Sequence, residues 1–218
     1  MEASVYAAGY PADAAAVLLV EIDGFEAGLD EDETRIRAIA SDCRAIDFRS
    51  ARDEKERLKL WKGRKGAFGA MGRINTDLYV LDGVVPRTRL EATLEKIYRI
   101  AGEYRVTLSN VFHAGDGNLH PNISYDGRDP EEKARVLAAG REILAACVEA
   151  GGSISGEHGI GIEKREFVPL LFSEEDLAMM ADLRHAIDPH ERSNPGKFFP
   201  DSLGCVEVGK RRMREVPL

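Results

Sequence analysis

The chain has 218 residues, 44% of them hydrophobic, which is enough to bury one substantial core or two small subdomains that share a sheet. Its 30 basic and 38 acidic side chains give a formal net charge of −8, which argues against nucleic-acid binding, because phosphate neutralisation needs a basic surface. No run approaches the roughly 20 apolar residues of a membrane span, and the N-terminus lacks the cationic-then-apolar order of a signal peptide. We therefore expect an ordinary globular protein that meets membranes only indirectly.

The chain has three cysteines, Cys43, Cys147 and Cys205. Their odd number and the absence of a CxxC spacing argue against disulfides and against a thiolate metal site. Cys43 and Cys147 fall on apolar faces of predicted helices, so we expect them in the core. This use of cysteine favours a reducing compartment, and we expect a cytoplasmic location.

The first elements predicted are a strand, a helix and a second strand. Residues 15–22 form a continuous apolar run before an Asp-Gly turn, which is typical of a buried strand. Asp30 and Glu33 have the spacing of a capping box, which predicts the start of a helix. A short strand is predicted at residues 46–49.

A helix is predicted over residues 54–70, with Leu58, Trp61 and Phe68 facing inward. Near its middle lies a cationic group: Lys62, Arg64 and Lys65. An arginine grips a carboxylate with two parallel hydrogen bonds, which is what an anionic substrate needs. The alternative is that these cations are only the solvated face of the helix.

From residue 77 onward the predicted order is strand, helix, strand, strand, helix, strand. The ranges are 78–81, 89–103, 106–113, 119–125, 131–150 and 153–155. This β-α-β-β-α-β pattern predicts an α+β fold with ferredoxin-like units, in which a largely antiparallel sheet has helices packed on one face. A last helix is predicted to begin at a capping box of Ser173 and Asp176 and to stop at Asp188-Pro189.

The densest group of reactive side chains lies at residues 111–120, VFHAGDGNLH, where a Gly-Asp-Gly-Asn turn joins two predicted strands. The turn folds His113 and His120 toward each other. Two imidazoles on a rigid hairpin suit a divalent cation of the zinc, manganese or iron class. A glycine-rich hairpin with merely half-buried histidines explains the same residues, and the spacing leaves both interpretations open.

A second group is the glycine-rich loop, residues 151–161, with five glycines and with Glu157 and His158 at its centre. Such a backbone can approach a ligand closely. A carboxylate beside two histidines would complete a three-ligand metal site with open positions. The alternative is a plain loop with a solvated Glu-His pair. Neither GxGxxG nor GxxxxGK[ST] occurs, so the familiar nucleotide-binding loops are missing.

Four motifs occur in this order: LWKGRK at residues 60–65, HAGDGNLHPN at 113–122, SGEHGIG at 155–161 and NPGK at 194–197. At these motifs the chain resembles the C-terminal domain of the FAD-linked oxidase superfamily, in particular the group of glycolate oxidase, D-lactate dehydrogenase and D-2-hydroxyglutarate dehydrogenase. The resemblance implies that residues 1–200 form this domain, followed by a loose charged tail at residues 201–218.

The resemblance also implies a role for each matching residue. His113, His120 and Glu157 match metal ligands, and His158 matches the proposed general base. The substrate contacts would be Arg64, for the carboxylate, and Asn122. The NPGK motif would contribute Asn194 and Lys197 to cofactor binding, although its sequence is also that of a plausible turn after Asp188-Pro189.

The substrate implied is a 2-hydroxy acid, oxidised to a 2-oxo acid with hydride transfer to FAD. A substrate-contacting lysine of the hydroxyglutarate branch has no counterpart, because residues 78–81 read LYVL before Asp82. That favours glycolate or lactate over a dicarboxylate.

The flavin-binding half of such enzymes is expected to be absent from this chain, because no Gly-rich pyrophosphate segment occurs. We therefore expect the isolated chain to be inactive and to hold FAD weakly or not at all. The resemblance further suggests electron-transfer subunits as partners. Two other classes remain open: a free-standing metal- or carboxylate-binding module, and a domain that docks other subunits and whose histidines are inert.

Overall fold

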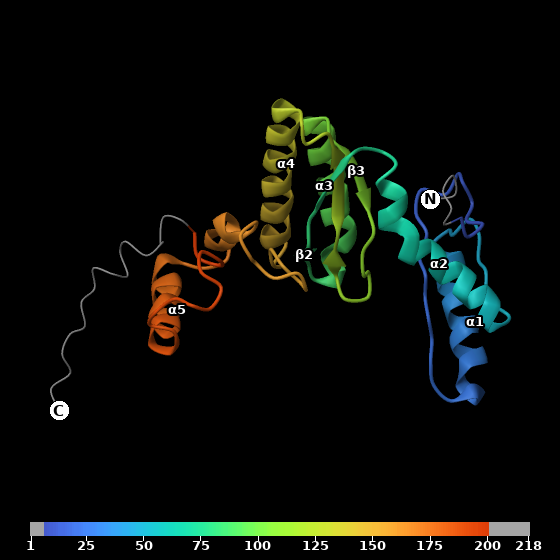
Figure 1. Cartoon of the computed structure of the whole chain (residues 1–218). Coiled ribbons are helices and arrows are strands. Elements are labelled where there is room, and N and C mark those ends of the chain that lie inside the picture. Colours follow the sequence, from blue (N-terminus) through green and yellow to red (C-terminus); the bar gives the residue numbers. More distant parts are fainter. Residues whose placement is uncertain (1–6, 201–218) are drawn as a thin grey trace. The chain divides into compact units, whose positions relative to one another are not determined.

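The structure is a computed structural model that describes residues 7–200. The chain divides into two compact units, Met1–Ile74 and Asn75–Leu218. Figure 1 shows the elements of both units, coloured along the chain. Among residues 7–200, no helix is both long enough and apolar enough to cross a membrane.

The first unit contains two helices, α1 (Glu26–Asp42) and α2 (Glu54–Met71). Helix α2 is confirmed close to its predicted bounds, and Asp53 caps it by accepting a hydrogen bond from the backbone N–H of Glu56. The predicted start of α1 is wrong, because the helix begins at Glu26 with no side-chain cap. Glu33 instead lies inside α1, where its carboxylate binds Arg37 and Ser50.

The predicted strands at residues 15–22 and 46–49 are wrong. Residues 15–22 are irregular, and Val17, Leu18 and Val20 are 48%, 72% and 55% exposed. A strand needs a partner for its backbone groups, and no segment within residues 7–200 pairs with either stretch. The apolar composition alone therefore did not decide the conformation.

The structure also corrects which side chains of the first unit were predicted to be buried. Cys43 is exposed, and α1 buries none of its residues. On α2, Leu58 and Phe68 are exposed, and four other positions are buried instead. Those buried positions are Gly63, Gly66, Ala67 and Met71. At Gly63 the reason is a close approach, since a Cβ there would lie 2.5 Å from the Tyr10 ring.

The second unit is built on a three-stranded antiparallel sheet with the order β1 (Asp77–Val80), β5 (Pro121–Tyr125), β3 (Thr107–Asn110). A second, two-stranded sheet pairs β2 (Gly83–Val84) with β4 (Asn118–Leu119). The predicted strand at 153–155 is reduced to an isolated bridge between Ser153 and Val84. The α+β class is confirmed.

The core of the second unit lies between the larger sheet and two helices, α3 (Leu90–Tyr104) and α4 (Pro130–Glu149). Tyr79, Ile123 and Leu108 are neighbours across the three strands, so they share the face that meets this core. Figure 1 shows α3 and α4 side by side against the strands. Each fully buried aliphatic side chain stabilises such a core by roughly 1.5–3 kcal/mol. The helices contribute Ile97, Ile100, Val136, Ala139, Ile143 and Leu144.

The remaining elements follow local signals in the sequence. Asp129 caps α4 by accepting the N–H groups of Glu131 and Glu132. The predicted capping box of Ser173 and Asp176 forms and begins α5 (Glu174–Ile187). Two short 3₁₀ helices, η1 (Arg87–Arg89) and η2 (Arg165–Leu170), precede α3 and α5. The predicted tail at residues 201–218 lies outside the described residues.

Candidate functional site

His120 occupies the break between β4 and β5, where it is only 3% exposed. Its Nδ1 lies 3.2 Å from the carbonyl oxygen of Leu81. Because a carbonyl only accepts hydrogen bonds, this contact assigns the proton to Nδ1 and turns the other nitrogen, Nε2, toward the glycine-rich loop. There Nε2 lies 2.9 Å from a carboxylate oxygen of Glu157. Either a second proton or a cation shared by the two groups makes this approach favourable.

Three potential metal ligands converge around that contact. His113, His120 and Glu157 each offer one donor atom, and these three atoms all lie within 4.8 Å of one another. We call them the donor triad. The His113 ring stands edge-on to the His120 ring, with 5.7 Å between the ring centroids. The hairpin turn thus brings together two histidines that are seven positions apart in the sequence.

His158 lies beside the donor triad. Its ring is stacked on His120 at 4.9 Å with an interplanar angle of 11°, and its Nε2 is 3.7 Å from Glu157. The imidazole is 44% exposed. A stacked, partly accessible imidazole has a fixed ring plane and can still exchange a proton with a bound molecule.

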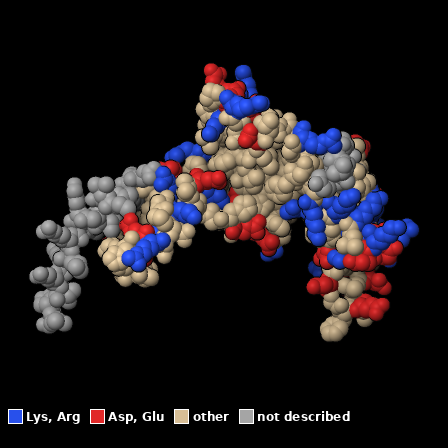
Figure 2. Space-filling view, in the orientation of Figure 1, with Lys and Arg blue, Asp and Glu red and all other residues tan. Residues whose placement is uncertain are grey.

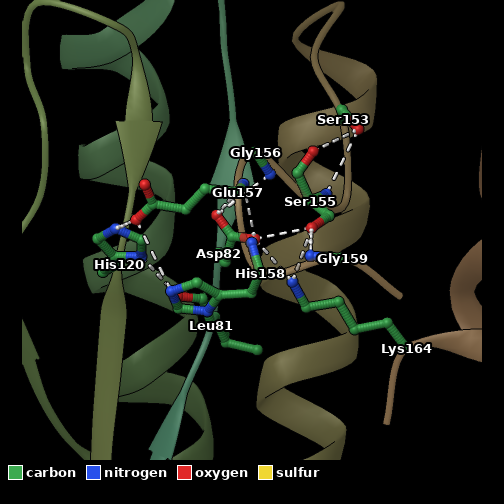
Figure 3. Close-up of polar contacts among 10 residues, drawn as sticks. All are labelled: Leu81, Asp82, His120, Ser153, Ser155, Gly156, Glu157, His158, Gly159 and Lys164. Carbon is green, nitrogen blue, oxygen red and sulfur yellow. Dashed lines mark hydrogen bonds and ion pairs between the residues drawn. The ribbon is translucent and has the colours of Figure 1, made fainter. Parts of the chain in front are cut away.

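Asp82 accepts hydrogen bonds from the backbone of the glycine-rich loop, although its place in the sequence indicated only a turn residue. Figure 3 shows Ser155 and Lys164 grouped around its carboxylate, together with the backbone nitrogens of the loop. Burial alone would raise the pKa of Asp82. The hydrogen bonds from the Ser155 hydroxyl, the His158 backbone and the Lys164 ammonium outweigh burial and hold that pKa well below its usual range.

Asn122 lies on β5, two residues beyond His120, and is fully buried. Its Nδ2 donates to the carbonyl oxygen of His120 at 2.6 Å. Its Oδ1 is buried and has no hydrogen-bond partner. A buried polar atom without a partner is rare, because it costs free energy that a hydrogen bond would recover. The side chain therefore has an acceptor available to a ligand.

The NPGK motif is connected to the glycine-rich loop. The backbone N–H of Phe198 donates to the carbonyl oxygen of Gly161 at 3.0 Å, and Arg165 donates to Gly196 at 3.1 Å. Within the motif, Lys197 donates to the side-chain oxygen of Asn194 at 3.2 Å, and both residues are exposed.

Arg64 lies on α2 in the first unit, where it is half-buried. The donor triad lies in the second unit, so the structure does not bring these residues together within one unit. Figure 2 shows Lys and Arg side chains gathered in the region of α2, with acidic side chains nearby.

The sequence was compared with known families and proteins. Residues 1–198 match the family described as FAD linked oxidases, C-terminal domain. The chain belongs to this family. It is 47% identical over 202 residues to the glycolate oxidase subunit GlcD of Escherichia coli K12, a match that covers 93% of this chain and 40% of that protein.

Two further relatives place this FAD-linked oxidase domain in the same group, which confirms the resemblance inferred from the motifs. The Bacillus subtilis glycolate oxidase subunit GlcD is 36% identical over 203 residues, covering 93% of this chain and 43% of the relative. The mitochondrial D-lactate dehydrogenase [cytochrome] 1 of Saccharomyces cerevisiae is 30% identical over 176 residues, a match that covers 77% of this chain and 29% of that protein. The chain spans less than half the length of these relatives.

The donor atoms of this domain fit a divalent cation in one of two overlapping sets. Besides the donor triad, Asp82, His120 and His158 also offer atoms within 4.8 Å of one another. Both oxygens of Asp82, however, already accept several hydrogen bonds. Glu157 is 52% exposed and keeps its carboxylate available, so the donor triad is the better fit.

The fit to FAD is partial. Asn194 and Lys197 offer one amide and one ammonium group on an exposed turn, which suits a polar contact with a flavin nucleotide. Two such groups do not enclose a cofactor of that size. Any tight flavin site therefore needs further residues.

Proposed function

We propose that this chain is the substrate- and metal-binding part of a FAD-dependent dehydrogenase that oxidises a small 2-hydroxy acid to the 2-oxo acid. The observation that carries the proposal is the convergence of the donor triad beside His158, in a chain that belongs to the FAD-linked oxidases. Relatives named as glycolate oxidase subunits and D-lactate dehydrogenases support a glycolate- or lactate-type substrate.

In this proposal His113, His120 and Glu157 hold a divalent cation of the zinc, manganese or iron class. Such a cation polarises a substrate oxygen and lowers the pKa of a hydroxyl group. The structure supports the arrangement through the Leu81 contact, which leaves His120 Nε2 as the ligand atom.

His158 is the proposed general base. Its Nε2 would accept the substrate hydroxyl proton while stacking on His120 keeps the ring in a fixed plane. A bound flavin would supply the acceptor for the C2 hydride, so the hydroxyl carbon becomes a carbonyl carbon. The protein contributes position and electrostatics.

Asn122 and Arg64 are the proposed substrate contacts. Asn122 has a buried Oδ1 without a partner, two residues beyond His120 on the same strand. Arg64 would bind the substrate carboxylate with two hydrogen bonds. Val80 is paired with Asn122 across β1 and β5, so it shares that face. An apolar neighbour there favours a monocarboxylate over a dicarboxylate.

The chain covers 40% of the Escherichia coli relative, and we propose that most of the FAD site lies in the part that this chain does not cover. Asn194 and Lys197 would add a contact at the edge of that site. The isolated chain would then have no dehydrogenase activity. Because the relatives named GlcD are described as subunits, we also propose partner subunits that pass electrons onward.

The decisive experiment is the metal content of the purified chain, measured by elemental mass spectrometry. We expect about one divalent metal per wild-type chain, and loss of tightly bound metal from His120→Ala without loss of secondary structure. His185→Ala is the matched control, because His185 is an exposed histidine on α5. Wild-type metal content in His120→Ala would exclude the ligand assignment.

A further inference from the structure

The carboxylate of Asp82 accepts three consecutive backbone N–H groups. Gly156 donates to Oδ1 at 3.1 Å, His158 donates to Oδ2 at 2.8 Å, and Glu157, between them, lies 3.3 Å from both oxygens. Successive N–H groups that point inward form a concave anion site. Here the anion belongs to the protein itself, and Asp82 has no exposed surface.

Lys164 and Ser155 complete the surroundings of this carboxylate. The Lys164 ammonium is almost fully buried and lies 3.0 Å from Asp82 and 3.3 Å from the Ser155 hydroxyl. Ser155 donates to Asp82 at 2.7 Å and accepts the N–H of Gly159 at 2.9 Å. Both charges are thus paired, which is the condition under which a buried ion pair is tolerated and can specify one conformation.

We infer that Asp82 is a positioning residue, which fixes the backbone of residues 155–159 so that Glu157 and His158 are presented to His120. The inference rests on the proposed function and deepens it, because it assigns this task to a residue outside the donor triad. Asp82 differs from the proposed metal ligands because both of its carboxylate oxygens already accept hydrogen bonds.

Leu81, the residue before Asp82, positions the other partner in the contact between Glu157 and His120. The Leu81 carbonyl oxygen orients the His120 ring, and the Asp82 carboxylate orients the loop that carries Glu157. The two sides meet at the 2.9 Å approach of His120 Nε2 to Glu157. Two adjacent residues after β1 therefore set the geometry between a hairpin and a loop that are distant in the sequence.

The test is the double variant Asp82→Asn/Lys164→Met, studied in the full 218-residue chain. Asparagine keeps the shape of Asp82 but replaces one acceptor by an NH₂ group, which cannot accept a backbone N–H. Methionine removes the ammonium group that would otherwise be left buried and unpaired. The first measurement is amide hydrogen exchange of the metal-free chain, followed by mass spectrometry. The second is titration with Co²⁺, followed by its visible absorbance.

We expect faster exchange in residues 153–161, with protection elsewhere in the second unit unchanged, and a loss of Co²⁺ affinity of about 10- to 100-fold. The absorption spectrum at saturating Co²⁺ should match that of the wild type, because the ligands are the same. Asp77→Asn is the matched control. Its carboxylate also accepts a backbone N–H, from Gly127 at 3.0 Å, but it should leave loop exchange and Co²⁺ affinity unchanged.

Wild-type exchange in the loop would overturn the inference, and so would faster exchange spread evenly over the second unit. A changed Co²⁺ spectrum would make Asp82 a ligand instead. If the double variant does not fold, Ser155→Ala replaces it, since it removes one bond to Asp82 and the acceptor for Gly159. If the wild-type chain binds no Co²⁺, the proposed metal site fails, while the exchange experiment still decides the role of Asp82.

Discussion

The two ring nitrogens of His120 face different partners, and this difference determines what the residue can do. Nδ1 is committed to the Leu81 carbonyl, so only Nε2 is available to a ligand or to Glu157. His158 has no such backbone contact to its ring among the described residues and is far more exposed. Two stacked histidines thus suit different roles, one as a fixed ligand and one as a group that exchanges protons.

The described cysteines should differ sharply in reactivity. Burial raises the pKa of Cys147 to about 12, whereas Cys43 is exposed. Because the thiolate is the reactive form, iodoacetamide at pH 8 should label Cys43 in the native chain and leave Cys147 unlabelled. Both should react in urea. Peptide mapping by mass spectrometry measures each site, and labelling of native Cys147 at the rate of Cys43 would contradict its burial.

The Asp82 carboxylate should contribute stability that depends on pH. Its pKa is lowered in the folded chain, so the contribution is complete above the unfolded value of about 3.9 and is lost as the pH falls through the folded value. We expect the difference in unfolding free energy between wild type and Asp82→Asn/Lys164→Met to shrink as the pH is lowered from 6 to 3. Urea unfolding in the presence of a chelator measures it, and a difference that does not change with pH would contradict the prediction.

Sequence patterns could identify the residues of the donor triad but not the residue that positions them. His113 and His120 flank a turn that the local sequence predicts, and Glu157 stands inside a run of glycines. Asp82 looks like an ordinary aspartate at the end of a strand. Its partners lie 73 to 82 positions further along the chain, so no local pattern indicates them.

The junction between the glycine-rich loop and β2 depends on one glycine. A Cβ at Gly152 would lie 1.7 Å from the carbonyl oxygen of Val84 and 2.8 Å from that of Cys147. Both neighbours are backbone atoms, which cannot move aside as a side-chain end can. The loop can leave α4 and bridge to β2 only because this position lacks a side chain.

Gly152→Ala should therefore destabilise the second unit by roughly 3 kcal/mol or more, as the loop or β2 is displaced. Gly102→Ala is the control, because Gly102 lies in α3 and a Cβ there would meet no neighbouring atom within 4 Å. At position 102, alanine should raise the free energy of unfolding by at most about 1 kcal/mol, because alanine has a higher helix propensity than glycine. Urea unfolding followed by circular dichroism compares the two, and equal stability of both variants would show that the junction can relax.

Elements were predictable from the sequence where their signals are local. The caps of α4 and α5, at Asp129 and Ser173, lie within a few residues of the groups that they bind. Residues 15–22 were not predictable in this way, because a strand forms only when another segment pairs with it. Strand β3 ends at Asn110, before the predicted end at residue 113, and His120, whose ring contacts the Leu81 carbonyl, interrupts the strand predicted at 119–125.

At the scale of the whole molecule, the residues proposed for one reaction are distributed over both units and over the part of the relatives that this chain does not cover. Arg64 belongs to the first unit, and the donor triad with His158 belongs to the second. The Escherichia coli relative is matched over 40% of its length. Metal binding can therefore be tested in this chain, whereas the proposed turnover needs the FAD-binding part that we place outside it.

In the proposed FAD-dependent dehydrogenase, tested with a flavin-binding part present, His158→Ala should lower kcat by about 100- to 10,000-fold, the usual contribution of a general base. KM should change little, because the donor triad and the proposed substrate contacts remain. Steady-state oxidation of glycolate and D-lactate with an artificial electron acceptor measures both constants, and His185→Ala serves as the control. A raised KM at unchanged kcat would assign His158 to substrate binding instead. An unchanged kcat and KM would remove it from the reaction, even though it is stacked on His120.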